Sequence, residues 1–452
     1  MNKLNNLFSD KRTGVLKANN KTGQRTEYQK DFDRLVFSSA FRQLQDKTQV
    51  FPLQGNVFVH NKLTHSLEVA SVGRSLGDLI GYYIAETFEK DLNTESLDFY
   101  KNDLSNVISS ACLCHDIGNP AFGHSGEDAI ANYFNKNETK LKQHFSNEEW
   151  SDFINFEGNA NAIRVLTQKQ NGKSEGGIKL TYATLCSIAK YPCESIAIDE
   201  NFTHRKKFGF FQSEKKTFID AAESTGMVKD DSNPLTYKRH PFVWITEVAD
   251  DICYNIIDLE DAHRLGIIEH TQCENFLMKL INCIGENDIN HIEEKYYEIT
   301  DKNEKIAHLR ARSIDVLTVK SANIFKENLV DIIHGNFNEP IFDIIKKDCE
   351  ALKEITAFSD EYIYNHRNVL EIENAGYNVM YELLNHFVPP IIKSKEDRTQ
   401  QENKALNLLP TTFNYDKEKR YIRTMGVLDY ISGMTDNYAT KLYKRIKGIE
   451  LE

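Results

Sequence analysis

The stretch CLCHDIGNPAFGHSGEDA, residues 112–129, brings together side chains that bind metals and transfer protons. His115 is followed directly by Asp116, and a second histidine, His124, stands nine residues further along the chain. Imidazole and carboxylate groups are common metal ligands, and histidine exchanges protons near neutral pH. Two interpretations follow: a metal site with an acid–base group beside it, or a core histidine followed by a glycine-rich turn.

A second segment, KLTHSLEVASVGRSL, places a histidine on the apolar face of an expected helix. His65 shares this face with Val69, Val72 and Leu76, which follow it at helical spacing. Its side chain is therefore expected to point inward. A single inward histidine is more often an ordinary core residue, so His65 indicates a metal ligand only in combination with the other segments.

A third segment, EVADDICYNIIDLEDA, carries a polar stripe along an otherwise apolar helix, because Asp250, Tyr254 and Asp258 recur every four residues. Carboxylates on a buried face are costly unless they are paired or bound to a metal. The stripe is open to two interpretations, a salt-bridged interface between helices or part of a metal site. The candidate ligand set that unites the three segments is His65, His115, Asp116 and Asp250.

This donor set favours a hard or borderline divalent cation. Two imidazoles and two carboxylates leave octahedral positions open for water and for a substrate oxygen. Mg, Mn or Fe fits that arrangement better than a closed structural zinc site does.

The elements that must position these residues are predominantly helical. The chain has 452 residues, 40% of them hydrophobic, and its apolar residues recur mostly three and four apart. We expect an all-α fold with minor β structure, with helices within 28–50, from 61, over 103–117 and over 240–266. Ser125, with Asp128 three residues later, predicts a further helix start that leaves His124 just outside it.

Composition excludes several classes of protein. A formal net charge of −12 argues against a general nucleic-acid binder, although local basic clusters occur at 205–207, 238–239 and 441–447. Eight cysteines in a chain of this length do not form a disulfide framework, which indicates free thiols in a reducing compartment. No apolar signal core or membrane span is found, so a cytoplasmic protein without membrane contact is expected.

The order His, His-Asp, Asp resembles the HD-domain metal phosphohydrolases. The neighbouring residues are similar, more narrowly, to bacterial deoxyguanosine triphosphate triphosphohydrolases and related dNTP triphosphohydrolases. The blocks that carry this resemblance are DFDRLVFSSAFRQLQDKTQVFP (31–52), NKLTHSLEVA (61–70), HDIGNPAFGHSGE (115–127), FEGNANAIRVL (156–166), LTYATLCSIAKYP (180–192), EVADDICYNIIDLEDA (247–262) and DYISGMTDNYA (429–439). They cover most of the chain and thin out between about 270 and 415.

The resemblance implies a reaction and the residues that perform it. dNTP, with dGTP the expected preference, would be cleaved to deoxynucleoside and inorganic triphosphate by attack of water on the α-phosphorus. The metal ligands would be the four residues of the candidate set. His124 is similar in position to the catalytic histidine of the family, and Glu127 to the acid that orients it.

The resemblance also implies substrate contacts. Lys190, Lys207 and Tyr254 look like the phosphate-binding groups of the family, and Gln49 and Asp258 are similar in position to residues that read the sugar. A further candidate departs from the family pattern, since arginine usually precedes the first metal histidine by three residues and the residue here is Lys62. Lysine keeps the charge but loses the bidentate fork of arginine.

The expected organisation is an N-terminal arm at 1–24, a catalytic HD core at 25–270, and a helical region at 271–452 that completes the pocket and makes contacts in a homo-oligomer. The resemblance implies an oligomer as large as a hexamer and allows a nucleotide or single-stranded DNA effector. Two alternatives stay open. One is another HD phosphohydrolase, such as a nucleotidase or a cyclic-nucleotide phosphodiesterase. The other is a nucleotide-sensing or single-stranded-DNA-sensing protein in which catalysis is secondary.

Overall fold

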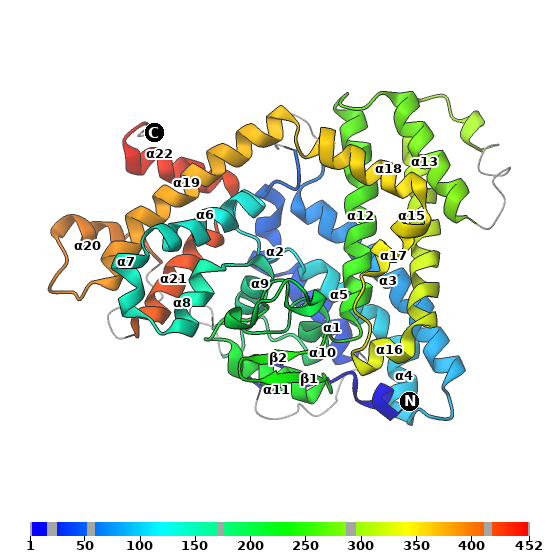
Figure 1. Cartoon of the computed structure of the whole chain (residues 1–452), viewed down its shortest axis with the longest axis horizontal. Helices are drawn as coiled ribbons and strands as arrows, with labels where there is room; N and C mark the ends of the chain where they lie inside the picture. Colours follow the sequence, from blue (N-terminus) through cyan, green and yellow to red (C-terminus); the bar gives the residue numbers. More distant parts are fainter. Residues whose placement is uncertain are drawn as a thin grey trace.

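The computed structural model describes residues 2–15, 25–51, 59–169, 175–285, 295–410 and 418–450. Helices dominate this part of the chain, as the sequence predicts (Figure 1). Within it, the only sheet is a two-stranded antiparallel hairpin of β1 (Lys229–Ser232) and β2 (Leu235–Tyr237). The expected all-α class with minor β structure is confirmed.

The first half of the chain contains the elements that carry most of the candidate residues. They are η1 (Asn2–Asn6), α1 (Glu27–Val36), α2 (Ser39–Gln43), η2 (Leu44–Asp46), α3 (Lys62–Thr87), α4 (Thr94–Asn102), α5 (Leu104–Cys114), α6 (Gly123–Lys136), α7 (Glu138–Leu141), η3 (Lys142–His144), α8 (Asn147–Ile154), α9 (Gly158–Thr167), α10 (Tyr182–Ile188), η4 (Ser195–Ala197), η5 (Thr203–Arg205), α11 (Lys215–Ser224) and α12 (Val243–Arg264).

The second half continues the helical pattern. Its elements are α13 (His270–Ile284), α15 (Lys302–Glu327), α16 (Leu329–His334), α17 (Ile341–Asp348), α18 (Glu350–Phe358), the π-helical turn η6 (Ser359–Ile363), α19 (Arg367–Ile392), α20 (Gln400–Leu406), α21 (Arg420–Ser432) and α22 (Asp436–Lys447).

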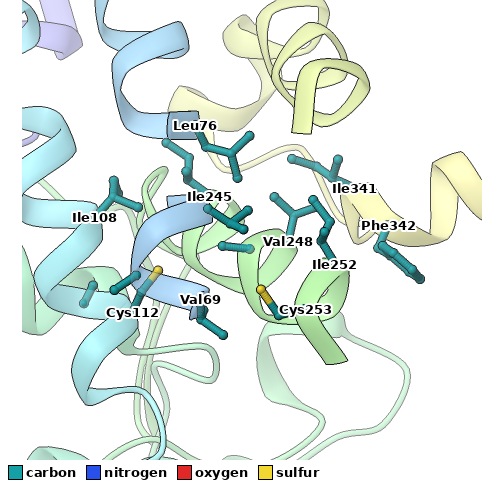
Figure 2. Packing of buried hydrophobic residues seen from close by; sticks show 14 of the residues in the cluster. Val69, Leu76, Ile108, Cys112, Ile245, Val248, Ile252, Cys253, Ile341 and Phe342 are labelled. Carbon is teal, nitrogen blue, oxygen red and sulfur yellow. The ribbon is translucent and has the colours of Figure 1, made fainter. Parts of the chain in front are cut away.

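The largest apolar cluster packs α3, α5 and α12 against one another. Figure 2 shows side chains of these helices meeting, among them Val69, Cys112 and Ile252, with Ile341 and Phe342 of α17 beside them. The apolar spacing of each helix makes this possible, because residues three and four apart form one face. The cluster fixes the three helices that carry His65, His115 and Asp250.

The second apolar cluster joins the C-terminal helices to the first half of the chain. Its members come mainly from α6, α8, α19 and α21, and Figure 1 shows α19 running beside α6 and α21. The first cluster likewise contains side chains from both sides of residue 270. The division into an HD core and a C-terminal region stays a prediction, while the packing of the two parts is continuous.

The start of the chain differs from the loosely held arm that its polar composition predicts. Leu4 and Leu7 are buried, and the backbone carbonyl of Leu4 accepts the hydroxyl of Tyr100. Arg12 is also buried and pairs with Asp31 and Glu27 of α1. These few anchors hold residues 2–15 on the core. Residues 16–24 of the predicted arm lie outside the described residues.

The polar segment 199–240 contains α11 and the β1–β2 hairpin. Phe210 and Phe218 stack at 4.5 Å between ring centroids and anchor this segment in a small apolar cluster that also contains Cys186 and Ala189. Among the described residues, no helix is both long enough and apolar enough to cross a membrane.

Candidate functional site

Three helices bring the predicted ligand set together. His65 lies on α3, His115 and Asp116 follow the end of α5, and Asp250 lies on α12. The Oδ1 atom of Asp250 is 3.1 Å from Nε2 of His65 and 3.3 Å from Nε2 of His115. One ligand atom each from His65, His115 and Asp116 lies within 4.8 Å of the others.

Hydrogen bonds orient these groups toward the shared centre. Nδ1 of His115 is 2.6 Å from the carbonyl oxygen of Cys112, to which it donates, so Nε2 is the nitrogen left for a ligand. The side-chain amide of Asn119 donates to Oδ1 of Asp116 at 2.5 Å. Asn119 belongs to the Gly-Asn-Pro turn that follows the His-Asp pair, which gives this turn a role in positioning Asp116.

The electrostatics of this cluster fit a divalent cation. Burial raises the pKa of Asp250, but the charges of His115 and Lys190 outweigh it and hold that pKa well below the usual carboxyl range. Burial lowers the pKa of His115, whereas Asp116 and Asp250 raise it overall to about 9. Ionised carboxylates at a buried position attract positive charge strongly. Two imidazoles and two such carboxylates are a donor set suited to Mg, Mn or Fe.

His124 and Glu127 form a second pair beside the cluster. Nδ1 of His124 is 2.9 Å from Oε2 of Glu127, and the other carboxylate oxygen accepts the N–H of Gly158 at 2.9 Å. The Glu127 side chain is buried, while that of His124 is 84% exposed. The hydrogen bond to Glu127 raises the pKa of His124 above its ordinary value.

The local structure around His124 corrects one expectation. The capping signature at Ser125 predicts a helix start there, but α6 begins at Gly123 and follows Phe122 in the left-handed backbone region, with φ of 63°. His124 therefore lies inside the first turn of α6. The N-terminal turn places Glu127 one turn further along the same face, which is why the two side chains meet.

Two lysines contribute positive charge. Nζ of Lys190 lies 3.2 Å from Oδ2 of Asp250, and Nζ of Lys207 lies 2.7 Å from Oε2 of Glu157. Burial lowers the pKa of Lys207, but Glu157 and Glu127 outweigh it and raise that pKa overall. Both lysines are thus held charged.

Lys62, the residue that departs from the family pattern, contacts the ligand set directly. Its Nζ atom lies 2.9 Å from Oδ2 of Asp116 and 3.4 Å from Oε1 of Gln49. Lys62 and Gln49 are therefore brought together with the candidate ligand set, as expected for candidates of one site.

Tyr254, a phosphate-binding candidate, and Asp258, a sugar-reading candidate, are placed differently from one another. Tyr254 faces the open space of the site, and its ring stacks on Tyr364 at 5.2 Å between centroids. Asp258, one turn further along α12, is buried, and its Oδ2 atom accepts the hydroxyl of Tyr364 at 3.1 Å. Tyr364 thus stands between Asp258 and the cavity. It comes from the region where the resemblance is thin, and no spacing in the sequence singles it out.

A cavity of about 550 Å³ is lined by all of the predicted site residues except Asp258. The side chains that line it are mostly polar or charged, and α19 adds Val369, Ile372 and Glu373. Its lining includes the predicted residues Gln49, Lys62, His65, His115, Asp116, His124, Glu127, Lys190, Lys207, Asp250 and Tyr254. The arrangement can hold an anion beside a metal and deliver a proton from His124.

Comparison with known proteins identifies the family of the chain. The HD domain family matches residues 63–190, and the phosphohydrolase-associated domain matches residues 343–445. The fold and the site therefore define an HD-domain phosphohydrolase.

Relatives narrow the class. A deoxyguanosinetriphosphate triphosphohydrolase-like protein of Synechocystis sp. is 37% identical over 98% of this chain and 99% of its own length. Proteins of the same name from Pseudomonas aeruginosa and Listeria monocytogenes are 34% and 32% identical, over 98% and 99% of this chain and 98% and 100% of their own lengths. The chain belongs to the family of deoxyguanosinetriphosphate triphosphohydrolase-like proteins.

Proposed function

We propose that this protein hydrolyses dNTP, with dGTP preferred, to deoxynucleoside and inorganic triphosphate through attack of water on the α-phosphorus. The observation that carries the proposal is that His124, held by Glu127, faces the same cavity as the His65, His115, Asp116 and Asp250 cluster. The names of the relatives support a nucleoside triphosphate as substrate.

The metal would be Mg, Mn or Fe, held by the four residues of that cluster. When bound, it would neutralise charge on the α-phosphate and lower the pKa of a water molecule. The cluster fits this role because its carboxylates stay ionised although they are buried.

The remaining residues bind the substrate and move one proton. Lys190 and Lys207 face the cavity as cations and would contact the triphosphate, with Lys62 beside the metal ligands. The leaving O5′ atom needs a proton, which Nε2 of His124 would supply. Since Nδ1 of His124 contacts Glu127, the carboxylate fixes the ring and stabilises its protonated form.

The nucleoside would lie against α12 and the start of α19. Tyr254 and Tyr364 present a stacked aromatic wall, and Val369 and Ile372 add apolar surface. Asp258 would act on the sugar through Tyr364, or directly after that tyrosine moves. Gln49, which also lines the cavity, would contact the sugar. The homo-oligomer, the effector and the cytoplasmic location stay predictions from the sequence.

The test is to incubate the metal-loaded protein with the four dNTPs, singly and in pairs, and to identify the products by chromatography. Inorganic triphosphate and deoxynucleoside, with dGTP the best substrate, support the proposal. Stepwise release of phosphate, or turnover of cyclic nucleotides alone, assigns the site to another HD phosphohydrolase. Binding of nucleotides without turnover in the presence of Mg, Mn or Fe favours the sensing protein.

A further inference from the structure

One carboxylate from the C-terminal region contacts both walls of the cavity. Asp436 is the first residue of α22 and is 9% exposed. Its Oδ2 atom accepts the N–H of Thr48 at 2.9 Å, and its Oδ1 atom accepts the N–H of Phe122 at 2.9 Å. Thr48 immediately precedes Gln49. Phe122 immediately precedes α6, whose second residue is His124.

The Phe122 backbone needs such support. A φ of 63° is costly for a side chain other than glycine and persists only where the surroundings impose it. Gly376 of α19 provides a second constraint, since a Cβ atom built there would lie 2.3 Å from Cγ of Phe122. The ring of Phe122 therefore packs against α19, while the backbone N–H of Phe122 donates to Asp436.

A buried lysine strengthens the same connection. Nζ of Lys47 donates to the carbonyl of Asn119 at 2.6 Å and to that of Ser432 at 3.1 Å. Burial lowers the pKa of Lys47 to about 8, although the charge of Asp436 opposes this. Lys47 and Asp436 thus connect the segment 47–49, which contains Gln49, to the 119–122 turn and to the C-terminal helices.

We propose that Asp436 is a positioning residue that fixes the His124 and Gln49 walls of the cavity by accepting the N–H groups of Phe122 and Thr48. This inference rests on the proposed function. His124 is two residues from Phe122 on a rigid helical turn, so a displaced Phe122 peptide displaces the proton donor. Misplacing a reacting group by about 1 Å costs about 100-fold in rate.

The experiment compares Asp436→Asn with the wild type and with a matched control. The amide retains one acceptor oxygen but turns an N–H₂ group toward the other backbone N–H, so one hydrogen bond is lost. We expect kcat for dGTP to fall about ten-fold or more. This is less than the cost of a full 1 Å displacement, because only one of the two hydrogen bonds is lost. Bound metal per chain, measured by elemental analysis, stays at the wild-type level.

The control is Asp152→Asn. Asp152 is also buried and accepts the N–H of Gln212 at 2.8 Å and the hydroxyls of Ser195 and Tyr421, so it too ties α21 to the first half of the chain. It does not line the cavity described above. A comparable fall in melting temperature is expected, with kcat within about two-fold of the wild type.

Metal content and the matched control separate positioning from general stability. The proposal is overturned if Asp436→Asn keeps kcat within about two-fold of the wild type, if it loses its metal, or if Asp152→Asn loses kcat equally.

Failure of the proposed function would be visible separately, because the wild type itself would release no triphosphate from any dNTP. Positioning is then judged from the ¹⁵N resonances of the His124 ring. For the proposal to stand, Asp436→Asn must shift these resonances and Asp152→Asn must leave them unchanged. Any other result overturns it.

Discussion

Glu127 joins His124 to the start of α9 through its two carboxylate oxygens. One oxygen lies 2.9 Å from Nδ1 of His124, and the other accepts the N–H of Gly158 at 2.9 Å. The exposed imidazole is thereby fixed to buried backbone, and its second nitrogen is left for the substrate. A ring held in this way meets the geometric requirement for a general acid.

The first prediction separates the two histidines of the 112–129 stretch. His124→Ala should lower kcat about 100-fold or more while bound metal stays at the wild-type level, because the ring is proposed to move a proton and its Nδ1 atom contacts Glu127, which is not one of the candidate metal ligands. His115→Ala should lose bound metal together with activity. Elemental analysis and steady-state kinetics on both variants measure the difference. Loss of metal from His124→Ala would contradict the assignment.

The second prediction concerns pH. The His124 pKa is raised chiefly by its hydrogen bond to Glu127, so Glu127→Gln should lower it. His124 donates a proton only while protonated, and kcat therefore falls as pH rises through its pKa. In Glu127→Gln this fall should begin at lower pH, and kcat at neutral pH should drop about ten-fold or more. If the pH profile of kcat has the same alkaline limb in both proteins, Glu127 does not raise the pKa of the proton donor.

The third prediction concerns phosphate binding by Lys207. Lys207→Gln would remove a proposed charge-assisted contact worth about 1.5–3 kcal/mol, so KM for dGTP should rise by between about ten-fold and about 150-fold. The matched control is Lys215→Gln, since Lys215 pairs with Glu194 at 2.6 Å with similar exposure. Its KM should stay within about two-fold of the wild type. Equal KM values for the two variants would remove Lys207 from the substrate site.

The fourth prediction tests the anchoring of residues 2–15. The side chains of Arg12 and Asp31 are 6% and 0% exposed, so Arg12→Ala leaves a buried carboxylate unpaired. The free energy of unfolding should fall by about 3–5 kcal/mol in chemical denaturation. Arg25, whose pair with Asp33 is largely exposed, is the control, and Arg25→Ala should cost less than about 1 kcal/mol. Equal costs would show that the segment does not depend on this pair.

Sequence periodicity was sufficient to predict the helices that position the candidate metal ligands. His65 shares a face with Val69 and Leu76, and burial of that face turns the histidine inward. The four-residue spacing along α12 likewise places Asp250 and Tyr254 toward the cavity. These are local relationships, and helical geometry converts them directly into positions in space.

Relationships between distant segments were not predictable in this way. Tyr364 and Asp436 reach the site from the C-terminal half, where tertiary packing and not spacing decides their neighbours. The start of α6 shows the same limit. The Ser125 signature is a valid local rule, but Asp436 and Gly376 impose a left-handed Phe122 and move the helix start to Gly123.

The central claim is that water attacks the α-phosphorus and that the O5′ bond to phosphorus breaks. Hydrolysis of dGTP in H₂¹⁸O by the metal-loaded wild type, followed by mass spectrometry of both products, tests it directly. The account predicts one ¹⁸O atom in inorganic triphosphate and none in deoxyguanosine. Label in deoxyguanosine, or products such as dGMP with pyrophosphate or dGDP with phosphate, would contradict it.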